Sequence, residues 1–234
     1  MACMKSPRDQ ERGRWIRNCG SWLGTIAFAM AFLLAAARSV AVSERTPSGA
    51  KLLVLGDSWS AEYGLKRGQG WVALLEARLK QSAAYQDIQI VNASVSGETT
   101  AGGLSRLPAL LERHHPQFVL IALGGNDALR GLPLETTRSQ LLAMIKQAKA
   151  RGASVLLIGM RMPPNYGSYG QSFERVFPRL AKEQGLPLVP FLMQGKEFDL
   201  SAFQADRIHP NEGAQPHMLE QAWPAIEAML KKSR

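Results

Sequence analysis

Cysteine is scarce in this chain of 234 residues, and both copies, Cys3 and Cys19, lie within the first twenty positions. A disulfide framework or a cysteine-based metal cluster is therefore excluded for the rest of the chain. Clusters of lysine and arginine with interleaved aromatic residues, which are typical of nucleic-acid-binding proteins, are also missing after residue 41. We expect no metal, no cofactor and no nucleic-acid partner.

The first 41 residues have the composition of a targeting segment. Basic residues from Lys5 to Arg17 precede the apolar run Trp22–Ala37, and the small residues around Ala41 follow it. Basic, then apolar, then small is the pattern of a secretory signal peptide. The apolar run is shorter than the roughly 20 residues of a membrane span. We predict cleavage after Ala41 and a periplasmic or secreted protein; the alternative is an uncleaved N-terminal anchor facing the periplasm.

Much of the positive charge belongs to this predicted signal peptide. It holds six basic and two acidic residues, a net charge of +4, whereas the whole chain carries +9. The rest of the chain therefore carries +5, which is ordinary for a solvated surface. We interpret residues 42–50 as a polar linker and residues 51–234 as one domain, with membrane contact expected only through the signal segment.

Short apolar runs alternate with amphipathic stretches along the predicted domain. Unbroken apolar runs are typical of strands that are buried on both faces of a parallel sheet. Alternation of such strands with helices predicts an α/β fold, a three-layer doubly wound sandwich of flavodoxin-like type with about five parallel strands and helices on both faces. The predicted strands are 52–55, 88–92, 118–123, 155–159 and 188–191, and the predicted helices lie near 71–82, 102–113, 135–150, 171–184 and 213–231.

A serine stands where the first predicted strand ends. Gly56-Asp57-Ser58 follows the run Leu52–Leu55 directly, and ligands of open parallel sheets bind beyond the carboxyl ends of the strands. Gly, Asp and Ser are also common turn and N-cap residues, so an ordinary turn is one interpretation. The other is a nucleophile held at the start of a helix, where the helix dipole favours developing negative charge.

A base for this serine is found near the C-terminus. Asp206 precedes His209 by three residues, so its carboxylate can fold back onto the imidazole Nδ1–H and leave Nε2 free to take a proton. The alternative is a helix-entry turn, with Asp206 as the cap and Pro210 at the first helical position. The other histidines favour structural roles: His114 and His115 end a helix, and His217 lies within the last one.

Backbone and amide donors follow the second and third predicted strands. Ser96-Gly97-Glu98-Thr99 can present the N–H of Gly97, and Gly124-Gly125-Asn126-Asp127 offers the Asn126 amide. Donors at this edge are what a developing oxyanion needs. The dinucleotide-like pattern from Gly68 to Ala73 does not follow a strand directly, so we assign it no nucleotide.

Taken together, Gly56-Asp57-Ser58, Gly97, Gly124-x-Asn126-Asp127 and Asp206-x-x-His209 resemble the four blocks of the SGNH/GDSL hydrolase superfamily. The segments VNASVSGETTAGGLSRLPALL and IALGGNDALRGLP more narrowly resemble its bacterial periplasmic thioesterase I, lysophospholipase L1 and arylesterase group. The resemblance implies Ser58 as nucleophile, His209 as base and Asp206 as its orienting acid. It also implies the N–H groups of Ser58 and Gly97 and the Asn126 side chain as oxyanion donors.

The resemblance implies a serine hydrolase that cleaves carboxylic esters and acyl-thioesters through an acyl-enzyme, with lysophospholipids as a further small-molecule substrate class. One alternative is an O-deacetylase acting on acetylated carbohydrate or peptidoglycan, and another is an inactive binding protein on the same fold. The apolar content of loops 129–133 and 160–167 favours an acyl chain. Trp59 stands where the family usually has leucine, and Arg207 where the subgroup often has glycine; both concern substrate preference.

Overall fold

The computed structural model describes residues 49–232. The predicted signal peptide, residues 1–41, and most of the predicted linker lie outside the described residues. Among residues 49–232, no helix is both long and apolar enough to cross a membrane.

The centre of the domain is a five-stranded parallel sheet with the order β2-β1-β3-β4-β5. This is the flavodoxin-like order, so the predicted fold class is confirmed. Every residue of β3 is buried, and so is every residue of β1 after Lys51, because helices cover both faces of the sheet. The strands are β1 (Lys51–Gly56), β2 (Gln89–Asn92), β3 (Phe118–Ala122), β4 (Ser154–Ile158) and β5 (Leu188–Val189).

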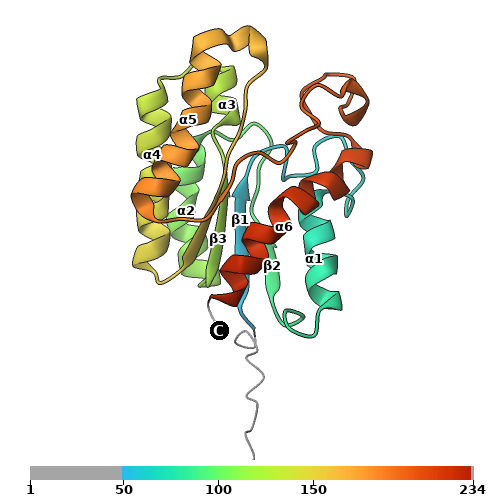
Figure 1. Ribbon diagram of the computed structural model, residues 1–234. Coiled ribbons are helices and arrows are strands. Elements are labelled where there is room, and N and C mark those ends of the chain that lie inside the picture. The colour runs from blue at the N-terminus through green and yellow to red at the C-terminus, as the bar shows by residue number, and fades with distance from the viewer. Residues whose placement is uncertain (1–48, 233–234) are drawn as a thin grey trace, which may run out of the picture. The chain divides into compact units, whose positions relative to one another are not determined.

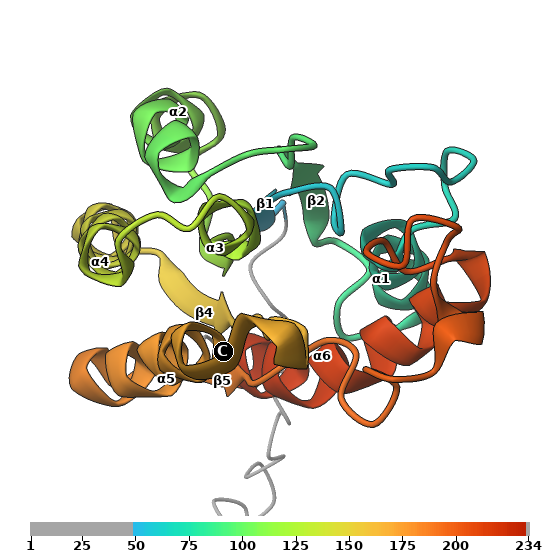
Figure 2. The ribbon, with the colours of Figure 1, turned by 90° about the horizontal axis from the view of Figure 1, so that it is seen from above.

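Two layers of helices enclose this sheet (Figures 1 and 2). On one side α1 packs against α6, and on the other α4 packs against both α2 and α5. These helices are α1 (Trp71–Gln81), α2 (Thr100–His114), α4 (Leu134–Ala150), α5 (Gly167–Gln184) and α6 (Gln215–Lys231). Their apolar faces and the sheet form one continuous core.

Two elements differ from the sequence prediction. The segment after β3, expected to be a loop, contains the short helix α3 (Gly125–Leu129), which begins after Gly124 in a left-handed conformation at φ +119°. Strand β5 has two residues instead of the four expected, since Pro190 has no N–H to continue the ladder. Three 3₁₀ turns were not predicted: η1 (Pro164–Tyr166), η2 (Leu200–Ala202) and η3 (Glu212–Ala214).

The chain reverses its direction of winding beside β1. The connection after β1 leads to β2 at one edge, and the next connection returns past β1 to β3. A crevice opens at such a switch point, beyond the carboxyl ends of the central strands. The segments that leave β1 and β3 there contain Ser58, in a turn, and Asn126, in α3.

Candidate active site

Ser58 lies in a tight turn immediately after β1. The carbonyl of Asp57 accepts the N–H groups of Ser60 at 3.0 Å and Ala61 at 2.9 Å, which fixes one helical turn around the serine. The prediction that Ser58 stands at the start of a regular helix is wrong, because α1 begins only at Trp71. The serine is 9% exposed, and its hydroxyl lines a cavity.

His209 lies in a loop that closes on itself. Phe203 and Pro210 form an antiparallel bridge, and the N–H of Gln204 donates to the carbonyl of His209 at 2.8 Å. Inside this loop Asp206 Oδ1 accepts the N–H groups of Ile208 at 2.9 Å and His209 at 3.0 Å. The helix-entry alternative is not what the chain adopts: α6 begins at Gln215, and the η3 turn before it is capped by Asn211.

These two segments bring three side chains into one line. His209 Nε2 lies 2.8 Å from Ser58 Oγ, and His209 Nδ1 lies 2.6 Å from Asp206 Oδ2. Partial burial alone would raise the pKa of Asp206, but hydrogen bonds from the backbone N–H groups of His209 and Ile208 and from the imidazole lower it to about 2. An ionised carboxylate only accepts hydrogen bonds, so Nδ1 carries the proton and Nε2 faces the serine as an acceptor.

Of the three expected oxyanion donors, Asn126 and Gly97 take different positions relative to Ser58. Asn126, in the first turn of α3, lines the same cavity as Ser58. Gly97 stands in a turn at φ +77°, where a residue with a side chain would be strained. Its carbonyl accepts from Arg130 Nη2 at 3.2 Å, but Gly97 is not part of the cavity lining. Within residues 49–232, no protein acceptor engages the N–H of Ser58 or of Gly97.

Asp57, beside the serine, is a buried carboxyl that the sequence argument did not single out. It is 2% exposed, and it accepts the N–H of Trp59 at 3.1 Å and the Asn126 amide at 3.4 Å. Burial outweighs these bonds and raises its pKa from 3.8 to about 7, with the charge of Asp127 adding to the rise. Asp57 therefore links the turn that carries Ser58 to the helix that carries Asn126.

A second buried carboxylate, Asp127, holds α3 in place. It accepts the Thr100 N–H at 2.9 Å and the Thr100 hydroxyl at 2.5 Å, both at the beginning of α2. Hydrogen bonds of a carboxylate to a helix N-terminus are favourable because they satisfy otherwise unpaired donors. The orientation of Asn126 thus depends on contacts between α3, α2 and the turn after β1.

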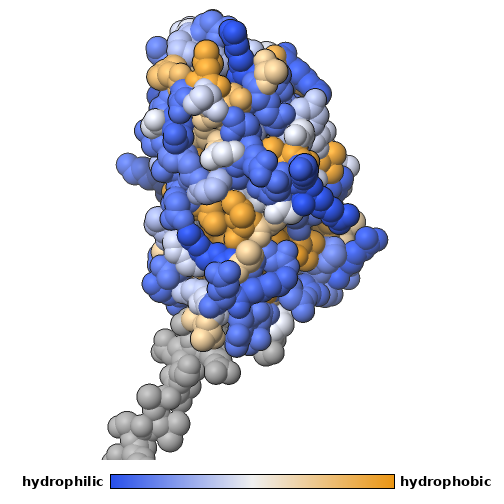
Figure 3. Space-filling model, turned by 90° about the vertical axis from the view of Figure 1, so that its right-hand side faces the viewer, coloured by the Kyte–Doolittle hydropathy of each residue, from blue (hydrophilic) through white to orange (hydrophobic). Residues whose placement is uncertain are grey.

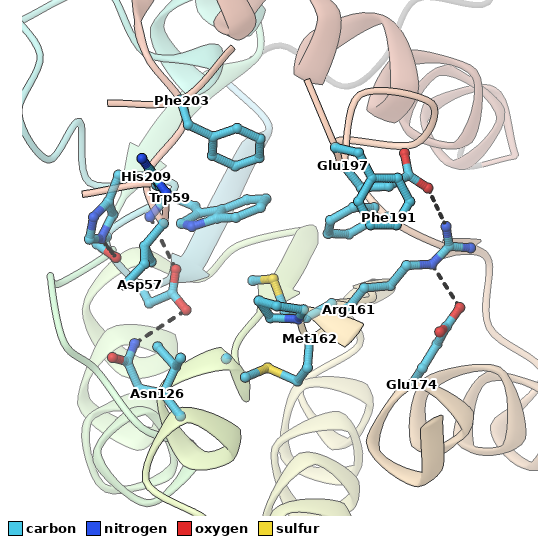
Figure 4. A pocket seen from close by; sticks show the side chains of 18 of the residues that line it. Asp57, Trp59, Asn126, Arg161, Met162, Glu174, Phe191, Glu197, Phe203 and His209 are labelled. Atoms are coloured by element: carbon cyan, nitrogen blue, oxygen red, sulfur yellow. Dashed lines mark hydrogen bonds and ion pairs between the residues drawn. The ribbon is translucent and has the colours of Figure 1, made fainter. Parts of the chain in front are cut away.

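The cavity beside Ser58 has a volume of about 690 Å³, and both apolar and charged side chains line it (Figure 4). Trp59, Phe191 and Phe203 supply aromatic surface, and the Trp59 and Phe191 rings lie 5.8 Å apart. Leu129 and residues 160–164 also line it, so the loops expected to flank the cleft do so. The unusual Trp59 and Arg207 both belong to the lining.

The cavity wall farther from Ser58 is charged. Arg161 Nε donates to Glu174 at 2.7 Å, and Nη1 donates to Glu197 at 3.0 Å. The guanidinium also lies 5.4 Å from the centre of the Phe191 ring. An apolar group that extends to this wall would have to displace water from paired charges, which is unfavourable.

The remaining histidines lie in structural positions. His217 lies on α6, and its Nε2 is 3.0 Å from the carbonyl of Gln194. His114 is the last residue of α2, at the end away from the cavity. The sequence argument missed an aromatic partner of His209: the Tyr63 ring lies 4.3 Å from the His209 ring, centre to centre. Only the folded chain brings this pair together. Within residues 49–232, no group of His, Cys, Asp and Glu side chains could hold a metal ion.

A serine hydroxyl bonded to an imidazole that is itself bonded to a carboxylate is the arrangement of serine hydrolases. Residues 54–215 match the GDSL-like Lipase/Acylhydrolase family. The chain belongs to this family and is an ester hydrolase of the GDSL type, so the predicted resemblance and enzyme class are confirmed.

Characterised relatives of similar length support the same class. The chain is 45% identical over 201 residues to "Esterase TesA" of Pseudomonas aeruginosa, covering 86% of this chain and 99% of that one. It is 41% identical to "Thioesterase 1/protease 1/lysophospholipase L1" of Escherichia coli K12, covering 77% and 85%. A crystal structure of the psychrotrophic esterase EstA from Pseudoalteromonas sp., inhibited by monoethylphosphonate, is 38% identical, covers 77% and 98%, and has a TM-score of 0.73.

The raised pKa of Asp57 makes a prediction about stability. Because the folded state binds this proton more tightly than the unfolded state, the free energy of unfolding should fall as pH rises from about 4 to 7 and then level off. Asp206 does not interfere, since its lowered pKa changes stability only at more acidic pH. Asp57→Asn has no such ionisation. From pH 5 to pH 8 its stability relative to wild type should rise by about 3 kcal/mol, at 1.36 kcal/mol for each pKa unit.

Denaturant unfolding of both proteins at several pH values measures this difference. A constant offset between Asp57→Asn and wild type across the range would contradict the raised pKa. At pH 5 we expect Asp57→Asn to be less stable than wild type, because asparagine has one acceptor oxygen for the two donors that Asp57 engages.

Proposed function

We propose that Ser58 is the nucleophile of an esterase and thioesterase reaction that passes through an acyl-enzyme. The observation that carries this proposal is the pair of contacts from His209, 2.8 Å to Ser58 Oγ and 2.6 Å to Asp206. A serine hydroxyl is a weak nucleophile by itself and needs an adjacent base. The imidazole is already in the position and tautomer in which it can take the proton.

In the proposed reaction, His209 Nε2 removes the Ser58 proton while Oγ attacks the carbonyl carbon of the substrate. Asp206 holds the ring and stabilises the imidazolium, and its low pKa keeps it ionised throughout. The carbonyl oxygen becomes an oxyanion, which the N–H groups of Ser58 and Gly97 and the Asn126 amide stabilise. His209 then protonates the leaving group. A water molecule, activated by the same imidazole, releases the acid and restores Ser58.

The oxyanion donors contact the carbonyl oxygen, which esters and thioesters share, and not the leaving atom. One site can therefore serve both substrate classes, in keeping with relatives that are named esterase, thioesterase and lysophospholipase. A thiolate leaves readily, whereas an alkoxide needs a proton. Protonation by His209 should therefore matter more for alkyl esters than for thioesters.

The side chains that line the cavity favour an acyl chain as the group that binds beside Ser58. Aromatic and methionine side chains, including Trp59, Met162 and Phe203, offer apolar contact, and burial of each methylene of a chain is favourable. An O-deacetylase for carbohydrate needs a small acyl site with polar groups around it, whereas aromatic rings occupy much of the wall beside Ser58. A binding protein without activity would not need the aligned Ser58, His209 and Asp206.

Replacement of the base tests the proposal. His209→Ala should lower kcat by at least a thousandfold with a nitrophenyl ester, because removal of a triad base leaves only the oxyanion hole and binding to act. His114→Ala removes a histidine from the opposite end of the sheet and should retain wild-type kcat. Equal losses of kcat in the two variants, both shown to melt at the same temperature as wild type, would refute His209 as the base.

Asn126→Ala tests the oxyanion site separately. Loss of one such donor typically lowers kcat about 10²–10³-fold, or ~3 kcal/mol. KM should change little, because the oxyanion exists only in the transition state. Steady-state kinetics on a nitrophenyl ester distinguish the roles: a raised KM with an unchanged kcat would make Asn126 a substrate-binding residue instead.

We further propose that residues 1–41 direct export and are removed, which leaves a periplasmic or secreted enzyme. The basic and apolar pattern of this segment supports the proposal. The intact mass of the exported protein tests it, and a mass that retains residues 1–41 would favour the membrane-anchored alternative.

A further inference from the structure

Exposed hydrophobic side chains gather at one edge of the domain. In residues 49–232, every large hydrophobic side chain classed as exposed follows the carboxyl end of a strand, and each is at least 42% exposed. We call this set the catalytic rim; it comprises Tyr63 after β1, Val95 after β2, Leu129 after β3, and Phe198, Leu200 and Ile208 after β5. Figure 3 shows that the face formed by α1 and α6 is largely hydrophilic, with hydrophobic groups in separate patches that include its upper end.

This distribution is unfavourable for a protein that meets only water at this edge. Phe198 is 73% exposed and Leu200 is 60% exposed, although both types of side chain gain free energy from burial. Single exposed hydrophobic residues are common on protein surfaces, but a group of them at one edge marks an interaction site. The rim therefore offers apolar surface to a partner.

The charges around the rim indicate what kind of partner this is. Lys66, Arg67, Arg130 and Arg207 are exposed on the same loops, and no carboxylate of the described chain pairs with them. The acidic side chains of these loops are already engaged. Glu62 accepts the backbone N–H groups of Gly68 and Gly70, and Glu212 accepts from the Gln69 amide. The others form pairs: Glu98 with Arg106, Asp199 with Lys196 and Asp206 with His209. Glu62, Asp206 and Glu212 keep their negative charge because their partners are neutral groups, but none of them pairs with these four cations. Apolar groups beside cations that have no carboxylate partner match a surface with acyl chains and anionic head groups.

The rim is also continuous with the cavity. Leu129, Phe198, Leu200 and Ile208 line the cavity beside Ser58 and are exposed at the same time, so they form its mouth. An acyl chain that entered from a lipid surface would pass along these side chains without crossing water.

We propose that the catalytic rim docks on an anionic lipid surface. The apolar side chains enter the boundary between head groups and acyl chains, and Lys66, Arg67, Arg130 and Arg207 contact the head groups. This adds a second membrane contact to the one expected from the sequence, which lay in the signal segment alone. Docking needs no bond to be cleaved, so it does not depend on the proposed function.

Vesicle sedimentation tests the proposal with the exported protein and ether-linked lipids, which an ester hydrolase cannot cleave. Phosphatidylcholine vesicles with and without phosphatidylglycerol are the two surfaces. Wild type and Ser58→Ala should bind the anionic vesicles equally, and high salt should weaken binding. The double variant Phe198→Ser/Leu200→Ser should bind at least tenfold more weakly.

A matched pair of charge variants isolates the electrostatic part. Lys66→Gln/Arg67→Gln should weaken binding to anionic vesicles by about fivefold for each charge, since each cation near such a surface is worth about that factor. Arg113→Gln/Lys232→Gln removes two exposed charges at the ends of α2 and α6, away from the rim, and should bind like wild type.

The proposal is overturned if wild type does not bind anionic vesicles, or if the Phe198→Ser/Leu200→Ser protein binds them as wild type does. Val95→Ser, which changes one rim residue outside the cavity lining, provides a second test should the double variant unfold: its binding must weaken too. Light scattering tests whether a second copy of the chain, rather than lipid, binds the rim. A dimer that the rim substitutions dissociate would make this edge an interface between two copies of the chain and would also overturn lipid docking.

Discussion

The hydrogen bond between Ser58 Oγ and His209 Nε2 is the contact on which the site depends. It spans 2.8 Å and joins two segments that are 151 positions apart in the chain. One segment is the turn after β1, which the central strands hold, and the other is the loop between η2 and η3. Any change that moves either segment by an ångström breaks this contact, because hydrogen bonds weaken steeply with distance and angle.

The fold supports this contact by fastening the two loops to each other. Gln204 donates through its amide to the carbonyl of Tyr63, in the loop after β1, and to the carbonyl of Pro210, in the loop of His209. The Tyr63 ring then lies against the imidazole. On the other side of Ser58, Asp57 bonds to Asn126, and Asp127 fixes α3 to α2. His209 and Asn126, the proposed base and oxyanion donor, are therefore held by separate sets of bonds.

The strands and the contact between Asp206 and His209 could be predicted because they depend on local pattern, whereas the flavodoxin-like sheet and the pairing of Ser58 with His209 followed from the alternation of strands and helices and from the family resemblance. Buried strands are continuous apolar runs, and Asp206 reaches His209 within one turn of chain. The pair Tyr63–His209, the buried carboxyl of Asp57 and the charged wall at Arg161 could not be predicted, since each depends on which loops the fold brings together. Helix α3 was missed because Gly124-Gly125 has the composition of a loop, while the bonds from Asp127 that stabilise it are tertiary. The catalytic rim was missed because exposure at a loop is not visible in the sequence.

The aligned side chains are proposed to make Ser58 a nucleophile. The most direct measurement is the intact mass of the enzyme, quenched within milliseconds of mixing with an activated aryl ester. We expect a burst of phenol release and one acyl group, mapped to Ser58 by peptide analysis and missing from Ser58→Ala. An adduct on Ser60 or Ser96 would contradict it, as would undiminished turnover by Ser58→Ala.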